Sequence, residues 1–130
     1  MNEQPTYWAV QYKSGAYIAK AIEAASPRIL VEMAAVLRHP LQGDLHHPYE
    51  AEVPLFHERR AASQREKVWV HRSDAEPYDG PIPAYDASLR DAWEQLVQAM
   101  QQMKNNDPDR AEWAAKSLEK LNELERDYWK

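Results

Sequence analysis

The hydrophobic period of this chain changes once along its length, and the change falls at a proline-rich interval. Residues Ser73 to Asp86 read SDAEPYDGPIPAYD, with three prolines and one glycine between Pro77 and Pro83. Proline lacks a backbone N–H and fixes its own φ angle, so neither a strand ladder nor a helix runs easily through such a stretch. We therefore expect a linker or crossover that joins two differently built parts of the chain.

The part before this interval consists of short strand-like runs separated by turn residues, as in a β-protein. The runs YWAVQYK (Tyr7 to Lys13) and AYIAKAIEA (Ala16 to Ala24) read as two strands, with Ser14 and Gly15 between them. A tight turn at this point would use the permissive backbone of Gly15. The pattern predicts a β-hairpin.

A strongly apolar run, RILVEMAAVL (Arg28 to Leu37), follows Pro27. Its alanines and its length would also permit a helix, and periodicity alone does not decide between the two. The flanking Pro27 and Pro40 and the β-branched residues favour a long, bent strand. One or two further strands are expected around Val53 to Phe56 and Ser63 to Val70, and several short strands at this spacing are typical of a small barrel.

After the interval the hydrophobic residues recur with the period of a helix. A first helix, with Asp86 as its N-cap, would carry one apolar stripe made up of Leu89, Trp93, Leu96, Val97, Met100 and Met103. Asp107 is placed to cap a second helix, with Pro108 at the first position, where a missing N–H costs nothing. The second stripe consists of Trp113, Ala114, Leu118, Leu121, Leu124 and Tyr128. The short loop between the helices predicts an antiparallel hairpin.

The fold class expected from these patterns is α+β, with a small β-barrel followed by a C-terminal antiparallel helical hairpin. A chain of 130 residues supports one ordinary hydrophobic core. We expect residues 1–76 to form the barrel and residues 77–130 to form the proline-rich joint and the hairpin packed on it, as one compact unit. The apolar hairpin could instead cover a second copy of the chain, so self-association stays open.

Composition excludes several kinds of function. The chain has no cysteine, which removes disulfides, thiolate nucleophiles, thiolate zinc sites and acylation on a cysteine. The first residues, MNEQPTYWAVQYKSG, lack the basic and apolar regions of a signal peptide, and no run approaches the ~18 apolar residues of a membrane span. A net charge of -5 disfavours broad binding to nucleic acid or anionic membrane. We expect a cytoplasmic protein without a lipid anchor and without direct membrane insertion.

One short interval, RHPLQGDLHHPYE (Arg38 to Glu50), concentrates three of the five histidines with an aspartate, two prolines and a glycine. A catalytic zinc needs only three protein ligands, and the candidates are His39, Asp44, His46 and His47. The two adjacent histidines would point in opposite directions in an extended segment, and a proline follows each group of histidines. We interpret the interval as a rigid loop and expect no metal, with a small metallohydrolase kept as an alternative.

Other catalytic signatures are missing from the sequence. FHERR (Phe56 to Arg60) begins like a zinc-protease helix, but Ala61 stands where that motif needs its second histidine. His57 beside Glu58 could form an acid/base pair, yet nothing supplies a nucleophile with its own base. The three glycines form neither a phosphate-cradling loop nor a nucleophile elbow. We therefore expect a protein that is not an enzyme and that uses no cofactor.

The stretch ERRAASQREK (Glu58 to Lys67) keeps a nucleic-acid-binding barrel as an alternative function. Bases could stack on Trp69 or Tyr17 while phosphates contact the basic residues Arg59, Arg60, Arg65 and Lys67. Glu58 and Glu66 interrupt this basic run, as on a solvated face with local ion pairs. Nucleic acid is therefore not the expected partner.

Long blocks of the sequence resemble a known family. The run AVLRHPLQGDLHHPYEAEVPLFHERRAASQREKVWV, with YKSGAYI before it and YDGPIPAYDASL after it, resembles the kinase-associated protein B (KapB) family of spore-forming bacilli. The resemblance extends from about Tyr7 to Tyr128. It implies an SH3-like barrel followed by helices, in an accessory protein that supports the sporulation sensor histidine kinase B in the phosphorelay.

Members of this family are often labelled lipoproteins, whereas this sequence has no cysteine to carry a lipid. The partner that the resemblance implies is therefore the cytoplasmic part of the kinase. Polar loops held by a rigid barrel are where recognition usually occurs. We therefore expect the partner-binding surface in two polar blocks of the sequence, around HPLQGDLHHP and FHERRA. Its residues are Arg38, His39, Gln42, Gly43, Asp44, His46, His57, Glu58, Arg59 and Arg60. The sequence leaves open whether the histidine-rich loop belongs to this interface or only closes the barrel.

Overall fold

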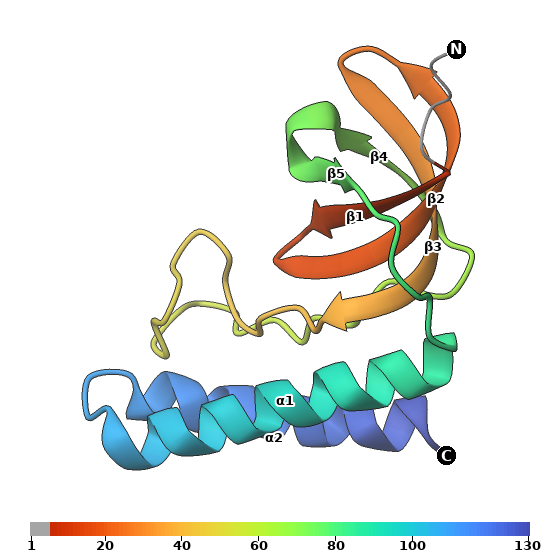
Figure 1. Cartoon of the computed structure of the whole chain (residues 1–130). Coiled ribbons are helices and arrows are strands. Elements are labelled where there is room, and N and C mark those ends of the chain that lie inside the picture. The colour runs from red at the N-terminus through yellow and green to blue at the C-terminus, as the bar shows by residue number, and fades with distance from the viewer. Residues whose placement is uncertain (1–5) are drawn as a thin grey trace. The chain divides into compact units, whose positions relative to one another are not determined.

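The computed structural model describes residues 6–130, so the first five residues of the N-terminal stretch considered above lie outside it. The strands come first: β1 (Tyr7–Tyr12), β2 (Gly15–Ala25), β3 (Arg28–Arg38), β4 (Lys67–His71) and β5 (Ala75–Pro77), with a 3₁₀ helix, η1 (Arg72–Asp74), between the last two. Two helices follow, α1 (Tyr85–Asn106) and α2 (Ala111–Tyr128) (Figure 1). The expected α+β class is confirmed.

The strands form one antiparallel sheet in the order β4-β3-β2-β1-β5. The short helix η1 carries the chain from β4 at one edge of the sheet to β5 at the other. Strands β1 and β4 also contact each other, although β2 and β3 lie between them in the sheet order. The sheet is therefore curled toward closure, as in the SH3-like barrel that the resemblance implied.

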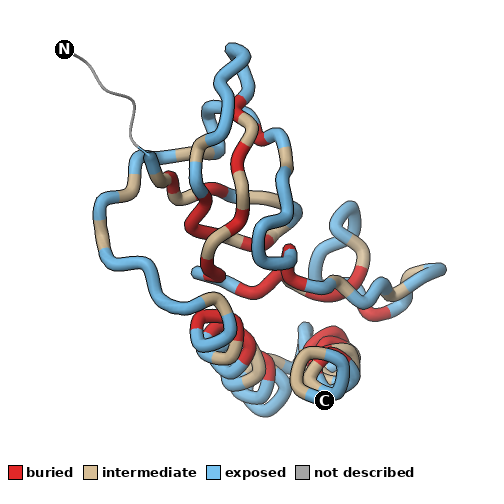
Figure 2. The backbone as a smooth tube through the Cα atoms, turned by 90° about the vertical axis from the view of Figure 1, so that its right-hand side faces the viewer, coloured by how far each residue is buried: buried red, intermediate tan, exposed pale blue. Residues whose placement is uncertain are grey.

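The curl has a cause in the pairing of β2 with β3. The register between these two strands shifts at three points, between Ala16 and Tyr17, between Ile18 and Ala19, and between Ala21 and Glu23. Each such β-bulge bends the strand and increases its twist. The prediction of a long, bent strand from Arg28 is confirmed, and its helical alternative is wrong. Figure 2 shows buried positions in the body of the sheet and an exposed tip on the β2–β3 hairpin.

The turn between β1 and β2 uses Gly15 for a different reason from the one expected. Positive φ angles occur at Lys13 (47°) and Ser14 (66°), and not at Gly15. Gly15 is buried, and a Cβ atom there would lie 2.6 Å from the hydroxyl oxygen of Tyr17. That oxygen accepts a hydrogen bond from the Ala62 N–H at 3.1 Å. Gly15 therefore leaves room for a fixed tyrosine ring.

Alternate residues of β1 and β3 are buried, as the period of a strand requires. The start of α1 is attached to this sheet core by Ser88. The Ser88 hydroxyl oxygen accepts a hydrogen bond from the Val36 N–H at 2.9 Å and donates one to the Tyr85 carbonyl at 2.7 Å. The largest fully buried side chains of the sheet are Trp8, Val10, Tyr17, Ile18, Val31 and Met33.

Of the two regions in which a further strand was expected, one contains a strand, β4, and the other does not. Residues 53–56 form no strand, and the Val53 N–H instead closes a local turn by donating to the Ala51 carbonyl at 3.2 Å. The strand expected from Ser63 begins only at Lys67, because a turn precedes it. In that turn Arg65 has a φ of 69° and the Glu66 N–H donates to the Ser63 carbonyl at 3.1 Å.

The two helices form the antiparallel hairpin that their stripes predicted. The indole N–H of Trp93, in the first half of α1, donates to the Leu121 carbonyl in the second half of α2 at 2.8 Å. The ring of Trp93 also meets the edge of Trp129, with centroids 5.8 Å apart. The buried core of the hairpin contains Trp93, Met100, Trp113, Ala114, Leu121 and Leu124. Within residues 6–130, no helix has the length and apolar character needed to cross a membrane.

Both expected N-caps are wrong. Helix α1 begins at Tyr85, so Asp86 lies in the first turn, where a carboxylate is still favoured by the helix dipole. Helix α2 begins at Ala111 with Arg110 as its N-cap. Asp107 instead stabilises the preceding turn, in which its Oδ1 accepts from the Asp109 N–H and its carbonyl accepts from the Arg110 N–H, both at 3.2 Å.

The chain divides into two compact units, each made of segments that are distant in sequence. Among the described residues, the first unit contains 6–39 and 61–92, which include the sheet and the start of α1. The second unit contains Pro40–Arg60 and Trp93–Lys130, which are the β3–β4 loop and the helical hairpin. This grouping differs from the boundary expected at residue 76, because the loop joins the helices. That residues 1–76 and 77–130 pack together as one compact unit stays a prediction.

Candidate partner-binding loop

Both blocks of the expected binding surface lie mainly in the β3–β4 loop, Pro40–Arg60, whose ends are joined by four hydrogen bonds. The Gln42 Oε1 accepts from the Arg59 N–H at 2.8 Å, and the Gln42 Nε2 donates to the Arg59 carbonyl at 2.8 Å. The Gly43 N–H donates to the His57 carbonyl at 2.9 Å, and the Arg59 Nε donates to the Gly43 carbonyl at 2.8 Å. These bonds fix the base of the loop.

Gly43 is required at this base by both its backbone and its surroundings. Its φ of 95° lies in the left-handed region that favours glycine. A Cβ atom there would lie 2.9 Å from the ring of Phe56 and 3.3 Å from the indole nitrogen of Trp113. Gly43 and Gln42 are both buried, so they support the loop and present little surface to a partner.

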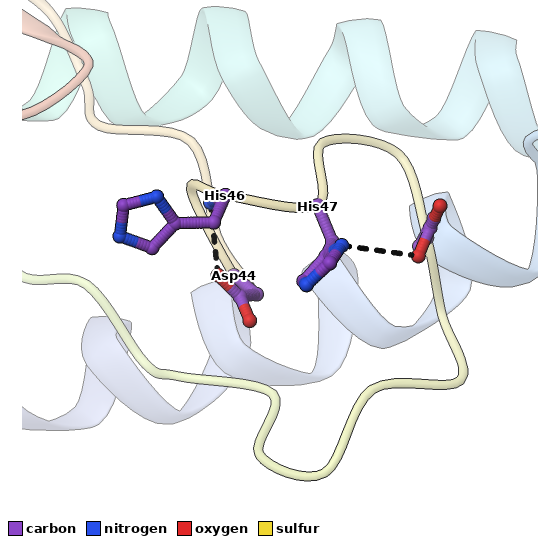
Figure 3. Close-up of polar contacts among 4 residues, drawn as sticks. Asp44, His46 and His47 are labelled. Carbon is purple, nitrogen blue, oxygen red and sulfur yellow. Dashed lines mark hydrogen bonds and ion pairs between the residues drawn. The ribbon is translucent and has the colours of Figure 1, made fainter.

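The tip of the loop is organised by Asp44 (Figure 3). Its Oδ1 accepts a hydrogen bond from the His46 N–H at 2.9 Å, and its carbonyl accepts one from the His47 N–H at 3.1 Å. The bond from the His46 backbone is the main reason that the pKa of the Asp44 carboxyl is lowered. The Nδ1 of His47 lies 3.7 Å from the Oε2 of Glu50. This short turn holds two exposed imidazole rings at the tip.

The geometry of the tip gives no ligand set for a metal ion. Figure 3 shows the rings of His46 and His47 pointing in different directions. His39, the other histidine of the zinc hypothesis, is 0% exposed and belongs to the first unit. Across residues 6–130, no three His, Asp or Glu side chains are grouped so that they could hold a metal. The metallohydrolase alternative therefore has no observation in its favour.

The second block of the expected surface is attached to α2. The pKa of the Glu58 carboxyl is raised, first by partial burial and then by a hydrogen bond with Glu123 and the nearby charge of Asp127. The Nη2 of Arg60 lies 3.9 Å from the Oδ2 of Asp127, and its guanidinium lies 5.5 Å from the centre of the Tyr128 ring. The loop thus presents charges of both signs along the edge of the hairpin.

The ten expected site residues divide between the two units. Gln42, Gly43, Asp44, His46, His57, Glu58, Arg59 and Arg60 come together in the second unit, whereas Arg38 and His39 belong to the first. Arg38 is exposed and donates from Nη2 to the Gln11 side chain at 3.5 Å and to the Ser14 carbonyl at 3.4 Å. The exposed candidates are Arg38, His46, His57, Glu58 and Arg60.

The sequence reasoning missed a pocket of about 300 Å³ in the second unit, which we call the acidic pocket. It is lined by Tyr49, Glu50, Ala51, Glu52, Asp109, Glu112 and Trp113. Acidic residues around the α1–α2 turn were visible in the sequence. Nothing in the sequence indicated that residues 49–52 lie against that turn, since the two segments are far apart along the chain.

The fold and this loop define a class of α+β protein in which an SH3-like sheet is joined to a helical hairpin that carries a polar loop. The sequence model described as Kinase associated protein B matches residues 12–129. The chain is 43% identical over 118 residues to the kinase-associated lipoprotein B of Bacillus subtilis (strain 168). The matched region covers 91% of this chain and 88% of that protein. It is also similar to the X-ray crystal structure of kinase-associated protein B from Bacillus cereus, with a TM-score of 0.75, 28% identity and 98% of each chain covered. The chain therefore belongs to the kinase-associated protein B family.

Proposed function

We propose that this chain is a non-enzymatic accessory protein that binds a sensor histidine kinase and supports its activity in a sporulation phosphorelay. The observation that carries the proposal is family membership, with 43% identity to a relative named for its association with a kinase. The kinase partner, and the cytoplasmic part of that kinase as the region bound, are extended to this chain from the resemblance.

The exposed part of the β3–β4 loop is the surface that we assign to the partner. His46, His57, Glu58 and Arg60 are exposed on a loop whose base is fixed by hydrogen bonds, so little ordering entropy would be lost on binding. Arg59 and Arg60 already contact the Gly43 carbonyl and the Asp127 carboxylate, which leaves fewer basic groups for a nucleic acid. We extend the proposal to a cytoplasmic location, because the cytoplasmic part of the kinase would be met there.

The proposal is tested by reconstitution. The chain would be crosslinked in sporulating cells and recovered together with its partners, and the kinase found would then be purified. Kinase autophosphorylation would be measured with and without the chain. We expect a histidine kinase in the crosslinked fraction and a change in the rate of autophosphorylation. Recovery of no kinase, or an unchanged rate with the recovered kinase, would count against the proposal.

The surface assignment has its own test. The double variant H57A/R60A removes two exposed side chains of the loop and should weaken kinase capture. The matched control K20A/Q64A also removes one basic and one further polar side chain, from exposed positions of the first unit. Both variants should keep the circular dichroism spectrum and the melting temperature of the parent. Equal capture by both variants would place the interface elsewhere.

A further inference from the structure

Trp69 is an exposed aromatic residue on the outer face of the sheet. Its neighbour in β4, Val70, is buried in the core, so Trp69 points to the opposite face, where it is 43% exposed. Its side chain lines an open notch of about 190 Å³ together with Ala25 and Arg28, which we call the Trp69 notch. The notch combines apolar surface with one basic group.

The basic group of the notch is not neutralised by the chain itself. Arg28 is exposed, and its guanidinium forms no ion pair within residues 6–130. An unpaired cation beside an exposed indole suits a ligand that carries a carboxylate close to an apolar group. Exposed aromatic side chains in grooves are the usual binding sites for proline-rich segments, whose extended form is already ordered before binding.

The chain itself contains an exposed segment of this composition at residues 79–83. Its apolar members, Pro81, Ile82 and Pro83, are all exposed. Proline fixes its own φ and favours an extended conformation in the residue before it, so Gly80 to Pro83 favours the polyproline II form. Asp79 at the start of the segment is exposed and forms no ion pair in the described part of the chain.

Hydrogen bonds hold this segment at both ends. The Tyr78 N–H donates to the Tyr7 carbonyl at 3.0 Å, and the Tyr78 hydroxyl donates to the Pro81 carbonyl. At the other end, the Ser88 N–H donates to the Ala84 carbonyl at 3.0 Å. A segment that is already ordered loses little conformational entropy when it binds.

The spacing of groups in the segment matches the spacing in the notch. Asp79 and Pro81 are two residues apart, which is about 7 Å in an extended chain. Trp69 is paired in the sheet with the residue two positions after Arg28, and such diagonal neighbours are about 7–8 Å apart. A carboxylate on the arginine would therefore place a proline ring against the indole. Trp69 and Ile82 are both exposed in the same chain, so the segment does not cover the notch of its own copy.

We propose that the Trp69 notch binds residues 79–83 of a second copy of the chain. The Asp79 carboxylate pairs with the Arg28 guanidinium of the other copy, and the Pro81 ring lies on its Trp69 indole. The contact is smaller than a standard protein–protein interface, so the self-association is weak and reversible. The proposal goes beyond the association with a kinase and is tested without one, so either proposal can fail while the other stands.

The first test measures self-association of the full chain by sedimentation equilibrium, at concentrations up to about 1 mM because the contact is weak. We expect the mean mass of the parent to rise with concentration. Arg28→Glu and Asp79→Lys should each weaken association about tenfold, because each places like charges opposite each other. The double variant restores the ion pair in reverse and should associate within about threefold of the parent. A monomer mass at every concentration, or no recovery in the double variant, would overturn the proposal.

Matched variants separate the contact from the net charge of the chain. Arg126→Glu and Asp91→Lys make the same charge changes at exposed positions of the two helices. Each should change association less than about twofold, because neither residue lies in the notch or in the proline-rich segment. Weakening equal to that of Arg28→Glu would show an effect of net charge only and would also overturn the proposal. Circular dichroism spectra like that of the parent would show that all variants fold.

The second test locates the contact with the isotope-labelled chain. The peptide acetyl-Tyr-Asp-Gly-Pro-Ile-Pro-Ala-Tyr-amide repeats residues 78–85, and the same peptide with alanine at both proline positions is the control. We expect a saturable shift of the Trp69 indole N–H signal with the proline peptide and a weaker one with the control. No shift of this signal, or equal shifts with both peptides, would overturn the proposal. Peptide binding by a chain that stays monomeric would assign the notch to a proline-rich segment of another protein, which also overturns it.

Discussion

The side chain of Gln42 pairs with the backbone of Arg59 through both of its amide atoms, each at 2.8 Å. This is the arrangement by which neighbouring strands pair, with one partner replaced by a side chain. The same Nε2 also donates to the Pro40 carbonyl at 3.0 Å. Since Gln42 is only 3% exposed, the loop ends are joined by polar groups that water cannot easily replace.

Replacing Gln42 with alanine should therefore unfold the loop base at lower denaturant concentration. The substitution removes three hydrogen bonds and leaves part-buried backbone groups of Arg59 unpaired, which should cost about 2 kcal/mol. The free energy of unfolding from urea titration checks this. Gln102→Ala, an exposed position of α1, is the matched control and should change it by less than about 0.5 kcal/mol. Equal effects of the two substitutions would contradict the role given to Gln42.

Two buried serines should respond to alanine with opposite signs. The Ser117 hydroxyl in α2 is buried and has no hydrogen-bond partner in the described part of the chain, so Ser117→Ala should stabilise the protein by about 1 kcal/mol. The Ser88 hydroxyl has two partners, Val36 and Tyr85, so Ser88→Ala should destabilise it by about 1–2 kcal/mol. Melting temperatures of the two variants, measured side by side, provide the comparison. A lower melting temperature for Ser117→Ala would show that its hydroxyl is satisfied.

Glu58 should make stability depend on pH in an identifiable direction. Its pKa is raised in the folded state by partial burial, by the hydrogen bond with Glu123 and by nearby negative charge. The folded state therefore favours the protonated form, so this contribution to stability is full below the unfolded pKa and is lost as pH rises through the folded pKa.

Glu58→Gln, which is always neutral, should consequently be more stable than the parent at neutral pH. The gain should be about 0.5 kcal/mol, since the group is mostly exposed and screened by solvent. It should disappear below about pH 4, where the parent carboxyl is protonated as well. Thermal melts at the two pH values give the measurement. Glu119→Gln, at an exposed position of α2, should show no comparable difference between the two pH values.

Two glycines in loops should differ in their tolerance of alanine. Gly43→Ala combines a φ of 95° with a contact of 2.9 Å to the Phe56 ring, and should cost about 2–3 kcal/mol. At Gly80 φ is not in the left-handed region, and the ring that a Cβ atom would meet belongs to Tyr78, whose hydroxyl is held by an exposed hydrogen bond to the Pro81 carbonyl. Gly80→Ala should therefore cost less, about 1 kcal/mol. Urea titrations of both variants compare these costs directly. A tolerated alanine at position 43 would mean that the loop base can rearrange.

The sequence predicted most of what local patterns control. Alternating burial identified β1 and β3, and the apolar stripes identified an antiparallel hairpin that the Trp93–Leu121 hydrogen bond confirms. Predictions failed where one particular contact, and not the hydrophobic period, decides. Gly15 is needed because Tyr17 turns back onto it, and residues 53–56 lack the strand that their apolar character suggested.

The candidate site was predicted only in part for the same reason. The histidine-rich block and the FHERR block were assigned to one binding surface. Nothing in the sequence, however, indicates that the amide of Gln42 pairs with a backbone 17 residues away. The acidic pocket was missed because Tyr49 and Glu112 become neighbours only when the loop lies against α2. Such long-range pairings follow from tertiary contacts, which a single sequence does not display.

A loop fixed at its base leaves its tip available for chemical labelling. Residues 45–50 are all exposed, while the hydrogen bonds of Gln42 and Gly43 close the segment behind them. Lengthening or altering a closed, exposed segment costs little conformational entropy. A photo-crosslinking amino acid in place of Leu45 would therefore keep a defined orientation. Irradiation of living cells could then link it covalently to whichever surface lies against the loop.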